Sequence, residues 1–359
     1  MSRRRTQRAL RGLALAALLV LLLPIAWIVG TGLARDRDLA AAWRAWRAPA
    51  PEPVATPVRV APAPFGPALY VGSLLDPELV EVSGLAASRR SPDLLWAVND
   101  GGNADRLYAL SLRGQLLHAF DVAIPEDHSA SNSDWEALAS FRFEGTPYLL
   151  IADVGDNQSW RRSVVLWIVE EPDLAQPAAK LVPRWRIDLV YADGPRDCEA
   201  VAVDEASTSV LLISKRTAPP VVYQAALAPL LRGEGGAVVA QPLARLTGIP
   251  PPSKELVDAL APEMLHMPTA LDLAPDGSAA VVLSYAAGWR FPRGPAQGWA
   301  EAFAGQPERI ALPPLALAEA VAYVGASLFV TSEVDRLSLV RWRAPLVRFD
   351  PVATADDGS

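Results

Sequence analysis

The sequence predicts an all-β protein, and three observations carry that prediction. From about residue 68 onward, short apolar runs alternate with Gly, Pro, Asn and Asp, which is typical of strands joined by turns. Helical periodicity is confined to residues 227–232 and 254–265, which we interpret as connections between strands. A short motif also recurs five times. With 51% hydrophobic and 20% charged residues, the chain has enough apolar material to bury a core.

The recurring motif is one polar residue followed by small and aliphatic residues. Its copies begin at Ser83, Glu136, Glu199, Thr269 and Glu319, at intervals of 53, 63, 70 and 50 residues. Each copy is followed about ten residues later by a more strongly apolar run, at residues 94–98, 148–152, 210–213, 280–284 and 327–331. Repeats of this length with several strands each indicate a β-propeller. We expect five blades within residues 68–348, with room for a sixth in the 70-residue interval.

The propeller architecture explains the small residues of the motif. The innermost strand of each blade faces its counterparts around a central channel, where large side chains would collide. The ring must also close, because an open ring leaves exposed strand edges. We expect residues 68–72 to form a strand that pairs with the blade built from residues 317–346.

The N-terminal part predicts a membrane segment. Residues 12–34 are 23 consecutive residues without a charge, and about 20 apolar residues in a helix span a bilayer. Five arginines within residues 1–11 predict a cytoplasmic N-terminus and export of everything that follows the segment. We therefore expect a single-pass protein of a bacterial inner membrane with a periplasmic domain. The alternative is a cleaved signal peptide ending at Gly32-Leu33-Ala34, which would leave a periplasmic or secreted protein.

Two further segments lie outside the predicted blades. Residues 35–67 are a juxtamembrane stretch followed by seven prolines between residues 49 and 67, which predicts an extended linker. Residues 349–359 are short, polar and acidic, and we expect a disordered tail there.

Charge and composition exclude several classes of function. The net charge is −7 although five of the 33 basic residues lie in the first eleven positions, so the folded part is more acidic still and a nucleic-acid partner is not expected. Cys198 is the only cysteine, which excludes an intrachain disulfide. The three histidines share no ligand spacing, which argues against a zinc site. No nucleophile-elbow or zinc-protease motif is present.

Strand direction predicts which polar residues meet. Because consecutive strands of a blade run in opposite directions, the start of the first strand and the end of the second lie on one face of the propeller. The acidic residues so placed, with Asp134 and Asp197 two positions before two of the motif copies, predict an acidic ring. The candidate metal ligands in it are Glu136, Glu199, Glu319, Asp153 and Asp156. The candidate substrate-binding residues are Asp100, Asn157, Lys215, Arg216 and Arg290, and no catalytic residue can be assigned.

Carboxylates gathered around one axis raise one another's pKa or require a cation. Oxygen ligands at that density suit Ca²⁺, which takes 6 to 8 of them, better than Zn²⁺. The alternative is that these acids are independent turn residues, because Asp and Asn favour turns. That explanation fits the three glutamates less well, because Glu is disfavoured in strands.

The motifs also carry a resemblance. Ser83-Gly84-Leu85-Ala86 leads to Leu95-Trp96-Ala97-Val98-Asn99-Asp100-Gly101-Gly102, and Asp134-Trp135-Glu136-Ala137-Leu138-Ala139 leads to Ala152-Asp153-Val154-Gly155-Asp156-Asn157. With the later motif copies, these strings resemble an uncharacterised family of exported bacterial β-propellers over residues 70–335. More distantly the chain is similar to SMP-30/gluconolactonase-like and phytase-like propellers. That similarity implies Ca²⁺ at the channel mouth and hydrolysis of lactones or phosphoesters. Ser83 stands where the lactonases place a metal-binding Glu.

Two functions follow from the sequence. The first is a noncatalytic binding module: a periplasmic propeller, either tethered to the membrane or secreted, that binds Ca²⁺. One face of this module would bind a small anionic ligand or an envelope protein. The alternative is a Ca²⁺-dependent hydrolase of phosphoesters or lactones, in which the cation polarises the substrate oxygen. The absence of a nucleophile motif favours binding.

Overall fold

The computed structural model describes residues 60–125, 134–236, 238–250, 267–285, 287–315, 317–333 and 343–352. The predicted membrane segment, most of the predicted linker, the helical stretch 254–265 and the end of the predicted tail lie outside these residues. Within the described ranges, no helix is long and apolar enough to cross a membrane.

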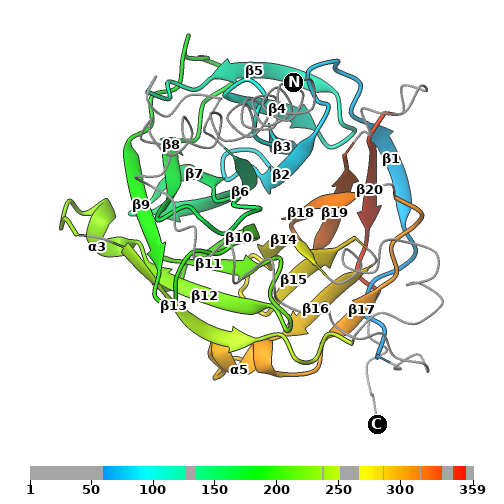
Figure 1. Cartoon of the computed structure of the whole chain (residues 1–359). Helices are drawn as coiled ribbons and strands as arrows, with labels where there is room; N and C mark the ends of the chain where they lie inside the picture. Colours follow the sequence, from blue (N-terminus) through cyan, green and yellow to red (C-terminus); the bar gives the residue numbers. More distant parts are fainter. Residues whose placement is uncertain are drawn as a thin grey trace, which may run out of the picture.

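The described strands form a β-propeller (Figure 1). They group into units of four strands, and the first three units are β2 to β5, β6 to β9 and β10 to β13. Strands β2 to β5 are Val82–Ala87, Leu94–Asn99, Arg106–Ser111 and Leu116–Asp121. Strands β6 to β9 are Trp135–Phe143, Thr146–Asp153, Val164–Glu170 and Trp185–Tyr191. Strands β10 to β13 are Cys198–Asp204, Ser209–Ser214, Val221–Ala226 and Val238–Arg245. Parallel pairing of β9 with β13 joins the second and third units into one eight-stranded sheet.

Two more units complete the described part of the ring. The fourth is β14 to β17, with bounds Pro268–Leu273, Ala279–Ser284, Gly288–Pro292 and Glu308–Ile310. The fifth consists of β18 (Ala318–Val324), β19 (Ser327–Ser332), β20 (Pro345–Phe349) and β1 (Leu69–Ser73). The innermost strands β2, β6, β10, β14 and β18 each contact the next one, and β18 contacts β2 (Figure 1). All five motif copies lie in these innermost strands, as the repeat pattern predicts.

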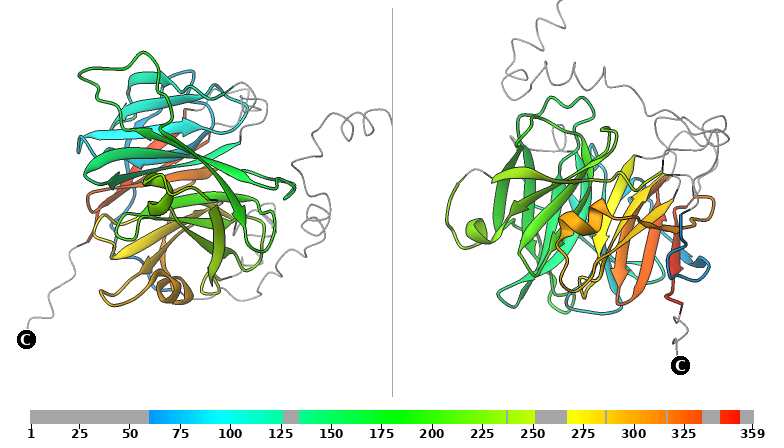
Figure 2. Two further views of the ribbon diagram at one scale, coloured as in Figure 1. Left: turned by 90° about the vertical axis from the view of Figure 1, so that its left-hand side faces the viewer. Right: turned by 90° about the horizontal axis from the view of Figure 1, so that it is seen from below.

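The ring closes where the sequence predicts it. β1, from the N-terminal side of the fold, pairs antiparallel with β20, opposing Leu69 to Arg348 and Tyr70 to Val347. The end of the predicted linker also belongs to the fold, because the Ala63 N–H donates to the Arg309 carbonyl at 2.9 Å. Residues from both ends of the described chain therefore hold the same side of the propeller (Figure 2).

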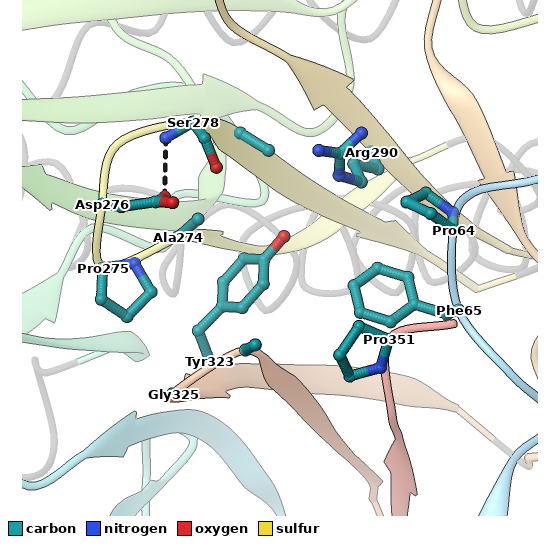
Figure 3. Close-up of a pocket in the computed structure, with 12 residues that line it drawn as sticks. Pro64, Phe65, Ala274, Pro275, Asp276, Ser278, Arg290, Tyr323, Gly325 and Pro351 are labelled. Atoms are coloured by element: carbon teal, nitrogen blue, oxygen red, sulfur yellow. Dashed lines mark hydrogen bonds between the residues drawn. The ribbon is translucent and has the colours of Figure 1, made fainter. Parts of the chain in front are cut away.

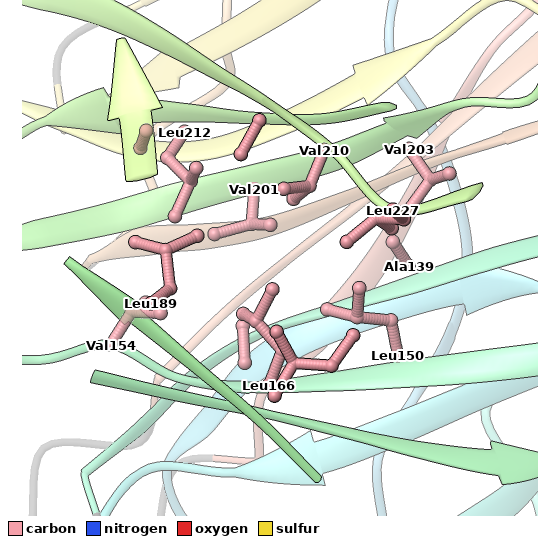
Figure 4. Packing of buried hydrophobic residues seen from close by; sticks show 14 of the residues in the cluster. Ala139, Leu150, Val154, Leu166, Leu189, Val201, Val203, Val210, Leu212 and Leu227 are labelled. Atoms are coloured by element: carbon pink, nitrogen blue, oxygen red, sulfur yellow. The ribbon is translucent and has the colours of Figure 1, made fainter. Parts of the chain in front are cut away.

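The core lies between neighbouring blades. In the cluster between the second and third units, Leu150 and Leu166 pack on the side of β10 and β11, where Val201 and Leu212 are buried (Figure 4). The second strands β7 and β11 are covered on both faces, so their sequences are nearly continuous apolar runs. The outer strand β13 instead alternates buried and exposed residues in its first half, because one of its faces meets water.

In the described part of the chain, two short helices lie between strands. Helix α3 (Ala228–Leu231) falls in the predicted helical stretch 227–232. Helix α5 (Trp299–Ala304) was not predicted, because six residues are too few to establish a helical period. Trp299 and Phe303 of α5 are buried beside Phe291, so the helix covers the outer part of the fourth unit.

The close approach of inner strands makes a prediction about Gly84. A β-carbon at Gly84 would lie 2.6 Å from the Leu138 nitrogen on β6 and 2.7 Å from Cγ2 of Val98. We expect Gly84→Ala to lower the free energy of unfolding by about 2 kcal/mol, because backbone must move to accept the methyl group. Gly235→Ala is the matched control, since nothing lies within 4 Å of that position. Equal denaturant midpoints for the two variants would contradict the predicted packing.

Candidate metal centre

One face of the propeller gathers the predicted acidic residues, and a repeated irregularity of the inner strands places them there. In β6, Trp135 opposes Asp153 and Ala137 opposes Ala152, so Glu136 is left between the two pairs. The same register shift occurs at the corresponding place in the other four inner strands, and the residues left between pairs are Ser83, Glu199, Thr269 and Glu319. A β-bulge of this kind turns one side chain out of the ladder. Each motif copy therefore begins with a residue re-aimed by the backbone.

The bulged residues have two uses. In the first and fourth units the residue carries a hydroxyl, which binds the start of the next inner strand. The Ser83 hydroxyl donates to the Trp135 carbonyl at 2.9 Å, and the Thr269 hydroxyl donates to the Ala318 carbonyl at 2.7 Å. In the other three units the residue is a buried glutamate. Ser83 thus links two blades, and this explains why no acid is needed at that position.

Glu136 lies in a group of three carboxylates that we call the acidic triad: Asp100, Asp134 and Glu136. Oxygen atoms of all three lie within 4.8 Å of one another. Asp134 is held from behind, because its backbone N–H donates to Oδ1 of Asp153 at 2.9 Å. Gly155 leaves the space the triad needs, since a β-carbon there would collide with the Asp134 carboxylate and lie 2.6 Å from Oε1 of Glu136.

Burial and repulsion by neighbouring carboxylates raise the pKa of all three triad carboxyls. Burial, with Glu199 and Asp100 as further causes, holds the pKa of Glu136 well above its usual range. Burial and then Asp134 raise the pKa of Asp100 to about 7. Burial raises the pKa of Asp134 to about 6, although Arg161 lowers it. Three ionised carboxylates at this spacing need a positive partner, and oxygen atoms are the ligands that hard cations such as Ca²⁺ take. The triad is therefore a buried acidic group with the composition to hold a metal ion.

A second group on the same face already contains its cation. The Lys215 ammonium contacts Oε1 of Glu199 and lies 5.3 Å from the centre of the Tyr285 ring. The Tyr285 hydroxyl donates to Oε1 of Glu319 at 2.9 Å. Burial and the nearby Glu333 raise the pKa of Glu319 to about 10, so this carboxyl holds a proton at neutral pH. We call Glu199, Lys215, Tyr285 and Glu319 the lysine cluster.

The remaining acids of the face are bound by arginines and backbone. The Arg161 guanidinium pairs with Oδ1 of Asp153 at 2.9 Å, and its backbone N–H donates to Oδ2 of Asp156 at 2.8 Å. The Asp156 N–H donates to Oδ1 of Asp197 at 3.0 Å. Arg216 binds the other oxygen of Asp197 at 2.6 Å. Asp153, Asp156 and Asp197 therefore form a frame behind the triad.

The structure thus sorts the predicted site residues into different roles. Of the candidate metal ligands, Glu136 is in the triad, Glu199 and Glu319 are in the lysine cluster, and Asp153 and Asp156 are in the frame. Asp100, a candidate for substrate binding, is a member of the triad. Asp134 was expected in the ring but was not among the candidate ligands. Asp134 lies two residues before Glu136, and this spacing was the sequence feature that could have identified it as a candidate ligand.

The candidate substrate-binding residues divide as well. Lys215, Arg216 and Asn157 lie on this face, where the Arg216 guanidinium contacts the Asn157 side-chain oxygen. Arg290 lies elsewhere, which corrects its expected place beside the ring. It pairs with Glu308 at 2.5 Å and lines a pocket with the β14–β15 turn, at the opposite end of the inner strands (Figure 3). Arg290 lies on the third strand of a blade, and the sequence alone does not predict toward which end of the propeller a side chain at that position points.

Comparisons with known proteins find structural similarity at low sequence identity. No protein-family model and no curated protein matches the chain. The PQQ-bound aldose sugar dehydrogenase from Streptomyces coelicolor is similar with a TM-score of 0.44 and 10% identity, over 81% of this chain and 99% of that one. A luciferin-regenerating enzyme is similar with a TM-score of 0.41 and 12% identity, over 76% and 78% of the two chains. A chain of a nidogen/laminin complex is similar with a TM-score of 0.39 and 13% identity, over 72% of this chain and 74% of that one. Membership of an exported family stays a prediction.

The lysine cluster predicts a pH-dependent effect of Lys215→Met. Removing the ammonium leaves the buried Glu199 carboxylate unpaired, and we expect a loss of roughly 3 kcal/mol in the free energy of unfolding at pH 8. The loss should be smaller at pH 5, where Glu199 takes up a proton at little cost. The double variant Lys215→Met/Glu199→Gln should recover most of the stability at pH 8. A loss that is equal at both pH values and unrelieved by the second substitution would contradict the pairing.

The triad predicts how stability depends on pH without divalent cations. Because the folded protein holds Asp100 and Asp134 with pKa values of about 7 and about 6, it binds more protons than the unfolded chain above about pH 4. The free energy of unfolding must then fall as the pH rises. We expect the melting temperature in chelator to decrease from pH 5 to pH 8. A melting temperature that increases over this interval would contradict the assigned shifts.

Proposed function

We propose that the protein is a binding module whose acidic triad holds a divalent cation, Ca²⁺, and presents it to a ligand at the mouth of the propeller channel. The observation that carries the proposal is the convergence of three carboxylates within 4.8 Å, one buried (Glu136) and two half-buried (Asp100 and Asp134), all with raised pKa values. Ca²⁺ takes 6 to 8 oxygen ligands. Three carboxylates therefore leave coordination positions for oxygen atoms of a ligand, and an anionic group on a small molecule or an envelope protein fits them.

The charge balance of the face supports a cation in the triad rather than elsewhere. Glu199 has its positive partner in Lys215, and Asp153 and Asp197 have theirs in Arg161 and Arg216. The triad carboxyls lie within 4.8 Å of one another, and the positive charges that lower their pKa values are Arg161 at Asp134 and Lys215 at Glu136, each of which also pairs with another carboxylate. A bound Ca²⁺ would compensate that charge and stabilise the folded state.

The same balance favours binding over hydrolysis. A Ca²⁺-dependent hydrolase of phosphoesters or lactones would use the cation to polarise the substrate oxygen and a neighbouring cation to hold its charge. Lys215 and Arg216 are on the right face for that role, but each is already bound to a buried carboxylate. Hydrolysis therefore remains the second candidate.

The proposal includes the surroundings of the module. We propose that the propeller has five blades, as the grouping of the described strands suggests, and that it works outside the cytoplasm of a bacterial cell. The support for export is the uncharged stretch 12–34 behind an arginine cluster, which would tether the module to the inner membrane. Cleavage after Ala34 would give the same module in a secreted or periplasmic form.

Calorimetric titration of the chelator-treated protein with Ca²⁺ tests the cation site. We expect saturable binding and a rise in melting temperature with Ca²⁺, because a ligand bound only by the folded state stabilises it. Glu136→Gln and Asp134→Asn should weaken binding by about tenfold or more, since each removes a charged ligand. The control is Glu144→Gln, an exposed glutamate of the β6–β7 turn. No binding to the parent protein, or equal binding by Glu136→Gln, would refute the site.

Turnover separates the two candidate functions. The Ca²⁺-loaded protein should show no hydrolysis of a phosphomonoester or a lactone above that of Glu136→Gln. Hydrolysis that requires both Ca²⁺ and Glu136 would replace the binding module with the hydrolase.

A further inference from the structure

A pocket of about 350 Å³ lies at the opposite end of the inner strands from the acidic triad, because the β14–β15 and β18–β19 turns line it. Figure 3 shows the residues that line it. Its walls come from the β14–β15 turn, the β18–β19 turn, and the segments that enter and leave the fold at Phe65 and Pro351. Ligand pockets start at about 300 Å³, so this pocket suits a small molecule. It shares no residue with the triad or the lysine cluster.

The apolar walls of the pocket are fixed in place by the backbone. Phe65 pairs with Pro351 in an isolated bridge, and the neighbouring Gly66 N–H donates to the Asp350 carbonyl at 2.8 Å. The ring of Phe65 is half-buried and faces the pocket across from Tyr323 (Figure 3). Tyr323 forms the floor and is only 5% exposed. These rings and prolines give flat apolar surfaces of the kind that accept the C–H face of a ring-shaped ligand.

The polar groups of the pocket include both donors and acceptors. The carboxylate of Asp276 accepts a hydrogen bond from the Ser278 N–H at 2.9 Å through Oδ1, and the residue is exposed toward solvent (Figure 3). On the other side, the Arg290 guanidinium and the Tyr323 hydroxyl both line the pocket (Figure 3). An acceptor and a set of N–H and O–H donors therefore stand on opposite sides of the apolar floor.

The charges around the pocket argue against a charged ligand. Arg290 pairs with Glu308 at 2.5 Å, which weakens its attraction for an anion. An anion would also approach Asp276. A cation would meet the guanidinium of Arg290, the other charged residue that lines the pocket. Complementary ligands are then neutral, carry hydroxyl groups, and have one apolar face.

We propose that this pocket binds one ring of a neutral sugar, with the C–H face of the ring on Phe65 and Tyr323 and its hydroxyls on Asp276 and Arg290. A pyranose has the required combination of an apolar face and a rim of groups that both donate and accept hydrogen bonds. The proposal does not depend on the cation site, because the two sites lie at opposite ends of the inner strands. The protein would then hold a sugar at one end and a cation-linked ligand at the other.

Saturation-transfer NMR of the full-length protein with D-glucose, D-galactose, D-mannose and N-acetyl-D-glucosamine tests this site. We expect saturable transfer to one or more of them, and weaker transfer to the charged ring analogues glucuronate and glucosamine. Tyr323→Phe and Asp276→Asn should each weaken binding by about tenfold, because the first removes a hydroxyl and the second replaces a charged acceptor by a neutral amide. Asp276 is exposed, so Asp276→Asn should keep the parent melting temperature, whereas Tyr323→Phe removes a buried hydroxyl and should lower it slightly. Glu144→Gln is the control and should bind as the parent does.

The outcomes separate this proposal from the cation site. Sugar binding should be unchanged in chelator and in Glu136→Gln. No transfer to any of the four sugars would overturn the proposal, as would equal binding by both pocket variants. Binding that is lost in chelator would place the sugar at the triad instead, and tighter binding of a proline-rich peptide than of every sugar would assign the pocket to another kind of ligand.

Discussion

A bulge at the start of each described inner strand is the constraint on which the channel mouth depends. Ordinary antiparallel pairing would alternate side chains between the two blade interfaces, where a glutamate would meet hydrophobic neighbours. The extra residue lifts one side chain per strand out of that alternation. The strand can then keep small residues where it faces the crowded centre, while the bulged residue at its start carries a polar group. Five separate chain segments thus deliver polar side chains to one place.

Bringing these polar side chains together places carboxylates close to one another, and their charges are compensated in a different way in each part of the ring. Where the bulged residue is Ser83 or Thr269, its hydroxyl binds a neighbouring strand and no charge is buried. Around Glu199 and Glu319, Lys215 and a retained proton compensate the acids. At Glu136 the neighbours within the triad are acids too, and a bound cation is the compensation we propose. Burial strengthens every one of these interactions, because water screens little there.

Much of the fold was predictable because it follows from local patterns. The motif spacing located all five described inner strands, and the edge problem predicted the pairing of β1 with β20. Strand direction predicted the acidic face. The pairing of individual acids was not predictable, because it depends on where the loops after β11 and β7 direct long side chains such as Lys215 and Arg161. Arg290 was misplaced for a related reason: a sequence shows which strand carries a residue more readily than which end of the channel the residue faces.

The central claim is that carboxylates from two neighbouring units of the propeller bind one cation. Anomalous diffraction tests this claim most directly. Mn²⁺ takes the same oxygen ligands as Ca²⁺ and scatters anomalously, so crystals grown with Mn²⁺ report its position. The account predicts one anomalous peak bounded by the carboxylates of Asp100, Asp134 and Glu136. A peak at the lysine cluster, or no peak with the three carboxyls bonded directly to one another, would contradict it.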